Sequence, residues 1–219
     1  MARIARVVLP GYPHHVTQRG VRSMDIFSSD EDRKEYLCLL SEQGRRFGVR
    51  FLAYCLMSNH VHLVAIPEEA GSLARGIGEA NRLYTRAVNF RTGVRGYLFQ
   101  GRFSSCAMDE RHFVAAMRYV ARNPVRVGLA KEAWDYRWSS AAYHVGLRKS
   151  DPLVKGHELL DMVSDWKALF RRDPEEMALL REKVRTGRPC GDAEFVARAE
   201  RLTRRILHPL PAGRPLKRK

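Results

Sequence analysis

The sequence predicts an α+β fold of the ferredoxin-like βαββαβ type, an antiparallel sheet with two helices on one face. Two observations predict it. Residues 50–57 (RFLAYCLM) and 60–66 (HVHLVAI) are strand-like and only Ser58-Asn59 separates them, and so short a connection joins antiparallel neighbours. A strand-like run and a helical repeat precede this pair, and a helical repeat and a strand-like run follow it.

Local signals mark the first strand and the first helix. Residues 14–19 form a β-like run that the chain enters through Gly11-Tyr12-Pro13. Ser29 is followed by three acidic residues, which is typical of a capped helix start. Apolar residues then recur at helical spacing until Gly48, which is expected to end the helix.

The second half of the unit repeats this order. Ser72 opens a helix whose apolar stripe includes Leu73 and Ile77. Residues 97–108 (YLFQGRFSSCAM) are the last expected strand, with a bend at Gly101. A further helix is expected over 109–122, where its apolar stripe can cover the opposite face of the sheet.

Beyond residue 122, the predicted structure rests on one proline and on weaker helical patterns. Pro124 is expected to end the helix over 109–122, because the residue before a proline rarely stays helical. A short helix is expected at 138–143. Further helical patterns lie near 158–170, 174–184 and 192–207. We therefore divide the chain into a main domain, 1–145, and a helical extension, 146–219.

The end of the chain is strongly basic. The last 22 residues hold eight Arg or Lys residues and one Glu. We interpret this segment as an arm that orders on nucleic acid, with Arg204, Arg205, Lys217 and Arg218 among its contacts. Two Gly-Arg-Pro tripeptides resemble minor-groove hooks, but general affinity for phosphates is the better interpretation.

The charge composition of the chain indicates what class of partner it binds. The 219 residues include 39 Lys and Arg against 24 Asp and Glu, a formal net charge of +15. A surplus of this size favours a polyanionic partner such as nucleic acid. Ribosome-associated and membrane-surface proteins can be as basic, so the charge by itself indicates no chemistry.

Several classes of protein are disfavoured. The four cysteines are widely spaced without a C-x-x-C pair, which argues against a cysteine zinc site and a disulfide scaffold. No apolar stretch approaches the roughly 18 residues of a membrane span. The first residues lack the apolar segment of a signal peptide. We expect a cytoplasmic protein without a membrane partner, associated with the nucleoid when it is bound to DNA.

His60-Val61-His62 is the centre of the chemical argument. In a strand, residues two apart point to the same face, so both imidazoles project together. Two adjacent imidazoles form half of a site for a divalent ion. The alternative is a structural role, which is the commoner one for an isolated His-x-His pair in an apolar strand.

Tyr119 and Asn123 form the second part of the expected site. Their four-residue spacing places the phenol and the amide on one side of a helix, beside the apolar stripe. From there the phenol can reach a site above the sheet. In the alternative interpretation, Tyr119 only borders the core and Asn123 caps the helix end.

Together these residues outline a reaction. A metal held by His60 and His62, with Asn123 as a candidate third ligand, would polarise a phosphodiester. Tyr119 would attack phosphorus and form a phosphotyrosine while a 3′-hydroxyl leaves. The covalent link conserves the bond energy, so the strand can be joined to another end.

Four segments carry a resemblance to a known family. Residues 57–64 (MSNHVHLV) resemble the strand with the His-hydrophobic-His motif of the HUH single-tyrosine transposases, and residues 118–129 (RYVARNPVRVGL) resemble their tyrosine helix. Residues 11–20 and 99–103 are similar to flanking strands of the REP-associated branch. The match runs in order over about 3–145, so 1–145 would be the catalytic domain.

The resemblance implies roles for particular residues. Tyr119 would be the nucleophile, His60 and His62 the metal ligands, and Asn123 the residue that completes the metal site. Some relatives carry Gln at the Asn123 position, and the Asn side chain is shorter by one methylene group. The implied cofactor is magnesium or manganese. The implied substrate is single-stranded DNA beside imperfect palindromic hairpins, and the protein would be a monomer or a homodimer.

Further side chains are candidates for contacts with DNA. Gln18, Arg19 and Arg102 belong to strands that should flank the site. Arg118, Arg122 and Arg126 surround the tyrosine, where they can grip phosphates. For each arginine a solvated surface charge is the alternative. His14, His15 and His112 are interpreted as ordinary hydrogen-bonded histidines.

Two other functions stay open. In one, the protein is a metal-dependent hydrolytic nuclease and Tyr119 is structural. In the other, it is a DNA-binding regulator that keeps the fold without catalysis, against which the joint presence of the four site residues argues. A tyrosine–DNA adduct distinguishes the transposase from the nuclease, and cleavage of any kind excludes the regulator.

Overall fold

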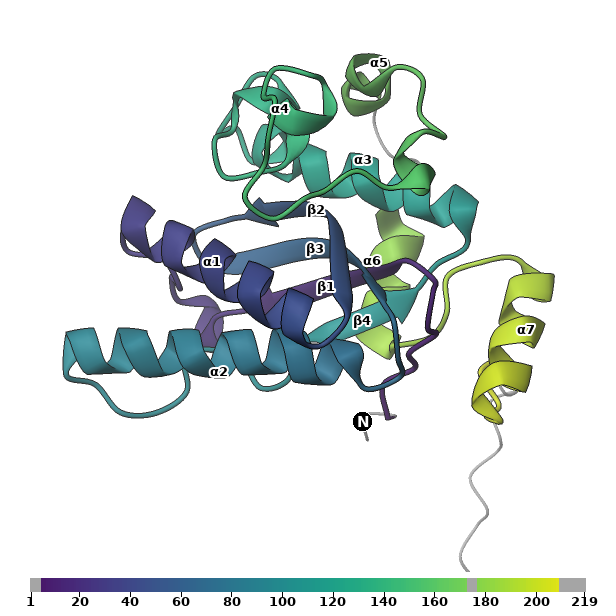
Figure 1. The fold of residues 1–219 in the computed structure, drawn as a ribbon, viewed down its shortest axis with the longest axis horizontal. Coiled ribbons are helices and arrows are strands. Elements are labelled where there is room, and N and C mark those ends of the chain that lie inside the picture. The colour runs from purple at the N-terminus through teal and green to yellow at the C-terminus, as the bar shows by residue number, and fades with distance from the viewer. Residues whose placement is uncertain (1–4, 173–176, 209–219) are drawn as a thin grey trace, which may run out of the picture.

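The computed structural model describes residues 5–172 and 177–208 (Figure 1). Its centre is an antiparallel sheet with the strand order β2-β3-β1-β4. The strands are β1 (His14–Arg19), β2 (Val49–Leu56), β3 (His60–Pro67) and β4 (Ser104–Ala107). Helix α1 (Asp30–Arg46) joins β1 to β2, and α2 (Ser72–Thr92) joins β3 to β4. The predicted βαββαβ order is therefore confirmed.

The hairpin between β2 and β3 orients the two histidines of interest. The Met57 N–H donates to the His60 carbonyl at 2.9 Å, which closes the turn. Beyond it, Cys55 pairs with His62. Because side chains alternate along a strand, His60 and His62 lie on the same face of the sheet.

Helices α1 and α2 pack against one face of the sheet (Figure 1). The predicted cap at Ser29 is present as a capping box, in which Ser29 and Asp32 each accept the other's backbone N–H. Between the two helices the buried Tyr36 hydroxyl donates to the Asn81 side chain at 2.8 Å. Tyr84 is also fully buried there, so this face is a closed aromatic core.

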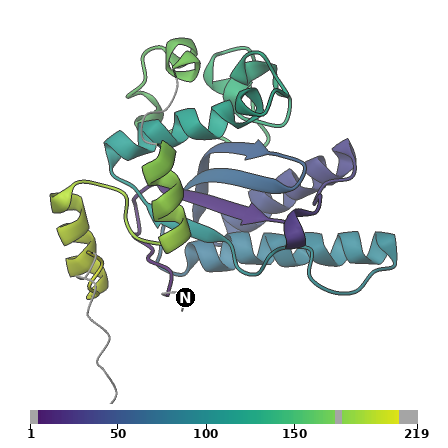
Figure 2. The ribbon, with the colours of Figure 1, turned by 180° about the vertical axis from the view of Figure 1, so that it is seen from behind.

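Helices α3 (Glu110–Arg126) and α6 (Met177–Thr186) lie on the opposite face (Figure 2). The expected apolar stripe of α3 faces the sheet, since Phe113, Ala116 and Val120 are completely buried. The expectation that an added helix covers this face is confirmed. Helix α6 was expected as a helical pattern, but its position against β1 and β4 was not.

The expectation that Pro124 ends α3 is wrong. The helix continues to Arg126, so Pro124 lies in its last turn. Proline removes one backbone donor there, but the turn still closes because the Gly128 N–H donates to the Val125 carbonyl and the Leu129 N–H to the Pro124 carbonyl. Gly128 has a positive φ of 76°, which ends the helix.

The expected strand over 97–108 is also wrong in its first half, since only Ser104–Ala107 pairs along β1. Phe99 makes an isolated bridge to Gly20 and its ring is buried. Gly101 adopts a positive φ of 72°, and its carbonyl accepts from the Gln18 side chain at 3.2 Å. A left-handed residue interrupts the pleat, so 97–103 becomes a looped segment that is anchored by Phe99.

The short helix expected at 138–143 begins later, as α4 (Ala141–His144). The residues before it cover the outer edge of β2 instead. The Trp138 carbonyl accepts from the Leu56 N–H at 2.8 Å, and Ser139 forms a bridge with Cys55. Pairing with an otherwise open strand edge outweighed the local helical tendency.

The extension contains the helices α5 (Trp166–Arg171), α6 (Met177–Thr186) and α7 (Ala193–Thr203). Of these, α5 and α7 are shorter than the patterns near 158–170 and 192–207 predicted, and the pattern near 174–184 begins outside the described residues. Three-residue 3-10 helices complete the inventory of the described segments, at Val21–Ser23, Ala133–Asp135 and Glu158–Leu160. The Asp165 side chain caps α5 by accepting from the Ala168 N–H, which starts a new helix where one continuous pattern was expected. Across the ranges 5–172 and 177–208, every helix is too short or too polar to cross a membrane.

A substitution in the central strand tests this packing. Leu63 of β3 is completely buried, so Leu63→Ala should lower the free energy of unfolding by about 2–5 kcal/mol in urea denaturation. Leu129→Ala is the matched control because Leu129 is 60% exposed, and it should change that free energy by less than about 0.5 kcal/mol. Equal effects of the two substitutions would contradict the burial of β3.

Candidate active site

A pocket of about 760 Å³ opens on the sheet face that carries α3 and α6. Its wall includes His15, His60, His62, Tyr119, Arg126 and Arg181. A second cavity, of about 810 Å³, lies between α1 and the segment around Arg137. No histidine lines that second cavity, so we assign the chemistry to the first.

The two histidines of β3 meet in this pocket with their ring centroids 5.0 Å apart. Their Nδ1 atoms are already engaged, His60 with the Asn59 side-chain oxygen at 2.6 Å and His62 with Nε2 of His15 at 3.1 Å. Nε2 is therefore the nitrogen that each ring would offer to a cation.

His15 is a member of this cluster that sequence reasoning missed. Thr17 of β1 pairs with His62 of β3, which places His15 on the same face as His62. Its ring stacks on that of His62 at a centroid distance of 5.3 Å. The even spacing of 15, 17 and 19 signals a shared face within β1, but only the register between strands reveals which neighbour that face meets.

The imidazoles of the cluster are neutral at neutral pH. Burial lowers the pKa of His15 to about 4, and it lowers the pKa of His60 to about 4 with help from the nearby charges of Arg19 and Arg126. Burial and the neighbouring histidines also lower the pKa of His62 well below its ordinary value. Neutral imidazole is the form that binds a metal ion.

Tyr119 of α3 lies directly against these rings. Its ring centroid is 5.3 Å from that of His62 and 5.5 Å from that of His15, and the residue is 5% exposed. The structure thus brings the tyrosine and the histidine pair together within one chain. A second copy is not required for this juxtaposition.

Two guanidinium groups flank the phenol. Arg126 lies over the Tyr119 ring with its Cζ atom 5.4 Å from the centroid. Nε of Arg181 donates to the Tyr119 hydroxyl at 3.4 Å, and its Cζ atom is 5.8 Å from the same centroid. A negative charge that develops on the phenol oxygen would therefore be close to two cations.

Arg181 belongs to α6, so the extension supplies part of the wall. Val184 and Arg185 of the same helix also line the pocket. The sequence predicted a helix near these positions, but no local signal connects it with a tyrosine 62 residues earlier in the chain. The packing of α6 on β1 and β4 alone makes the connection.

Asn123 occupies a different place from the one expected of a metal ligand. It is 1% exposed and does not line the pocket. Its Nδ2 donates to the Tyr119 carbonyl at 2.9 Å, and its Oδ1 accepts from Arg126 at 2.9 Å. In this geometry Asn123 positions Arg126, and direct ligation would require the amide oxygen to exchange this partner.

The expected DNA contacts divide into two groups. Arg19, Arg102 and Arg126 line the pocket, as does Gln18. The Gln18 side chain donates to the Gly101 carbonyl, so it supports the loop that forms the wall. Arg118 lies on α3 outside the pocket wall.

The remaining candidates serve other contacts or lie elsewhere. Arg122 donates to the carbonyls of Phe170 and Arg171, which ties α5 to α3. Arg205 donates to the carbonyls of Ala5 and Arg6, so it holds the N-terminal segment. Arg204 is exposed at the end of α7, and Lys217 and Arg218 lie outside the described residues. Contacts within the protein thus occupy Arg122 and Arg205, which the sequence analysis assigned to DNA.

The donor set fits a divalent ion only in part. Within 5–172 and 177–208, no three His, Cys, Asp or Glu side chains are placed to hold one ion. His60 and His62 supply two neutral nitrogens at the base of a pocket rich in arginine. Magnesium and manganese commonly take the rest of their ligands from water and from phosphate oxygens of a substrate, which such a pocket would admit.

The neutral buried histidines make stability depend on pH. An unfolded histidine has a pKa near 6.5, whereas buried His15 has a pKa of about 4, so protonation favours unfolding. The contribution of His15 is complete above pH 6.5 and is lost as the pH falls toward 4. His15→Gln should therefore remove about 2 kcal/mol of the difference in unfolding free energy between pH 7 and pH 5.

Urea denaturation at the two pH values measures this difference. His157→Gln is the control, because His157 is only partly buried and its pKa is lowered less, so its profile should stay closer to that of the wild type. An unchanged profile in His15→Gln would show that folding does not lower the pKa of His15.

Comparisons with known proteins bear on the fold and on the family of this chain. A solved REP-associated tyrosine transposase, bound to a REP hairpin, is similar with a TM-score of 0.58 and 18% identity over 72% of this chain and 93% of that one, which supports the fold. A Deinococcus radiodurans R1 structure, provisionally assigned as a transposase, has a TM-score of 0.39 and 15% identity over 54% of this chain and 95% of that one. No curated protein sequence matches significantly. The family model described as "Transposase IS200 like" matches residues 12–123, just over half of the chain, and the protein therefore belongs to the IS200-like transposase family.

Proposed function

We propose that this protein is a metal-dependent transesterase that cuts and rejoins single-stranded DNA beside hairpin elements through a phosphotyrosine at Tyr119. The observation that carries the proposal is the contact of the Tyr119 ring with His15 and His62 at the base of an arginine-lined pocket. Family membership supports action on DNA ends. The similar structure that holds a REP hairpin supports a hairpin substrate.

In the proposed step the Tyr119 oxygen forms a new bond to phosphorus. The bond from phosphorus to the 3′ oxygen breaks at the same time, and that oxygen leaves as a hydroxyl after it takes up a proton. The phenol proton passes to solvent. Arg126 and Arg181 are close enough to the phenol to stabilise the charge that develops on its oxygen.

The other residues of the pocket bind and orient the strand. Arg19, Arg102 and Arg185 would hold the phosphates on either side of the reacting one. His60 and His62 would hold the divalent ion through Nε2, and His15 would fix the His62 ring through its bond to Nδ1. When bound, the ion supplies Lewis-acid polarisation of the phosphodiester.

Removal of the phenol oxygen tests the nucleophile. Tyr119→Phe should keep the fold and DNA binding but reduce cleavage of a labelled hairpin with a single-stranded flank by at least about a thousandfold. Cleavage is measured with manganese on a denaturing gel, and mass spectrometry detects the tyrosine–DNA adduct. Tyr143→Phe is the matched control, because Tyr143 lies on α4 away from the pocket, and it should cut normally. Sustained cutting by Tyr119→Phe without an adduct would establish the hydrolytic nuclease instead.

Removal of an imidazole tests the proposed ion site. His62→Ala should weaken manganese binding by more than about tenfold, and His15→Gln should weaken it by about tenfold because His62 loses its partner. Binding is measured by calorimetry without DNA, so the result does not depend on activity. His157→Ala should leave the affinity unchanged. Equal affinity of His62→Ala and the wild type would rule out this site.

A further inference from the structure

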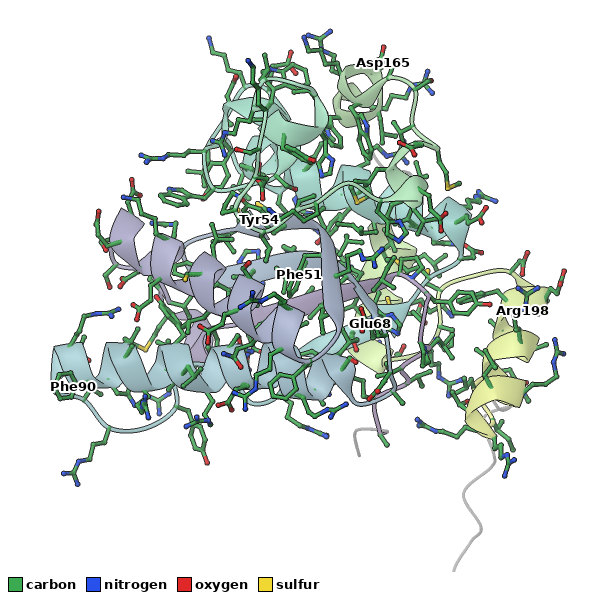
Figure 3. The ribbon with its side chains drawn as sticks, in the orientation of Figure 1. Phe51, Tyr54, Glu68, Phe90, Asp165 and Arg198 are labelled. Atoms are coloured by element: carbon green, nitrogen blue, oxygen red, sulfur yellow. The ribbon has the colours of Figure 1, made fainter. Side chains whose placement is uncertain are left out.

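A patch of exposed side chains at the end of α2 is not used by the pocket. Phe90 is 89% exposed, Tyr97 is 87% exposed and Val94 is 58% exposed. Figure 3 shows Phe90 at the far end of α2, away from the sheet. Three large apolar side chains within eight residues form a local concentration that commonly marks a binding surface.

Arginines accompany these side chains. Arg82, Arg86 and Phe90 follow one another at four-residue intervals along α2, so they share one stripe of the helix. With Val94 and Arg95 they line a shallow hollow of about 620 Å³. We call Arg82, Arg86, Phe90, Val94, Arg95 and Tyr97 the α2-tip surface.

The loop that carries this surface is held in shape by hydrogen bonds. The Asn89 side chain donates to the Gly96 carbonyl at 2.9 Å, and the Val94 N–H donates to the Asn89 carbonyl at 3.1 Å. Gly93 and Gly96 have positive φ values of 67° and 122°, which other residues rarely adopt. The turn that carries Tyr97 beside the end of α2, where Phe90 lies, is therefore ordered.

Within the α2-tip surface, Arg82 is paired with Glu79 at 2.6 Å, which leaves Arg86 and Arg95 to attract an anion. Arg91, which points to α1, is neutralised by Asp32 and Glu35 at 2.6 Å each. By contrast, Arg86 and Arg95 form no ion pair among the residues that the structure describes. Exposed aromatic rings beside unneutralised guanidinium groups match unpaired nucleotides, whose bases stack and whose phosphates are anionic.

The surface continues into the wall of the active-site pocket. Directly after Tyr97, the Leu98 carbonyl accepts from the Val21 N–H at 2.9 Å, and buried Phe99 anchors the chain. Gln100, three residues after Tyr97, lines the pocket, as does Arg102. Three residues span at most about 10 Å, so the backbone at Tyr97 lies within about 10 Å of the pocket wall at Gln100.

We propose that the α2-tip surface binds unpaired nucleotides of the DNA substrate, with bases stacked on Phe90 and Tyr97 and phosphates held by Arg86 and Arg95. The inference rests on the proposed function for the identity of the substrate. It adds a second contact region that fixes where the strand enters the pocket. The chemistry at Tyr119 does not depend on it.

Fluorescence anisotropy with a labelled hairpin that carries a single-stranded flank tests the inference. Phe90→Ala and Tyr97→Ala should each weaken binding by about 5- to 100-fold, the usual effect of losing one stacked base. Both side chains are almost fully exposed, so the fold should be unaffected. Phe90→Trp keeps an aromatic ring and should bind as tightly as the wild type. Leu147→Ala removes an exposed side chain elsewhere and should leave the affinity unchanged.

Salt dependence separates stacking from charge. The aromatic variants should keep the wild-type slope of log affinity against log salt, whereas Arg86→Ala should reduce it by about 0.7 for a contact to a single strand. If the aromatic variants bind the flank as tightly as the wild type, the inference is wrong. Normal DNA binding together with altered sedimentation of these variants would overturn it in favour of contact between copies of the chain.

The same samples separate this inference from the proposed function. Loss of binding by the aromatic variants, combined with cutting that yields no tyrosine adduct, would support the α2-tip surface and reject the transesterase. Adduct formation by the wild type together with unchanged binding by the aromatic variants would support the transesterase and reject the α2-tip surface.

Discussion

The register between β1 and β3 places Thr17 opposite His62 and Arg19 opposite His60, and the composition of the pocket follows from this pairing. Strand side chains alternate, so a shift by one residue would turn His15 and Arg19 to the face that α1 and α2 cover. The hairpin between β2 and β3 holds the same register from the other side. Backbone pairing in the centre of the sheet thus brings together three imidazoles from two strands.

The helix that covers this face completes the arrangement. Helix α3 buries Phe113, Ala116 and Val120 against the sheet, and the same packing lowers Tyr119 onto the histidine rings. Burial keeps the imidazoles neutral, while the cations remain at the rim on Arg19 and Arg126. The protein therefore combines a neutral donor pair with a positive entrance, which suits a metal ion and a phosphodiester together.

The C-terminal extension contacts the pocket and also other parts of residues 1–145. Helix α6 brings Arg181 to the Tyr119 hydroxyl, and the Arg122 side chain binds carbonyls at the end of α5. On the other side of the sheet, the buried Tyr54 hydroxyl donates to Asp151. These contacts explain why several arginines of a very basic chain have partners within the protein rather than in a ligand.

The sequence alone determined the order of strands and helices, the shared face of His60 and His62, and the position of Tyr119 beside an apolar stripe, because each depends on spacing within one element. It did not determine the length of β4, where the contact of distant Gln18 with Gly101 outweighed local preference. Nor did it determine the passage of α3 through Pro124, where the backbone bonds of Gly128 and Leu129 close the last turn. The tertiary structure decided that His15 and Arg181 join Tyr119 and that Asn123 turns away toward Arg126. Strand register and helix packing set these neighbours, and both depend on contacts between segments that lie far apart in the chain.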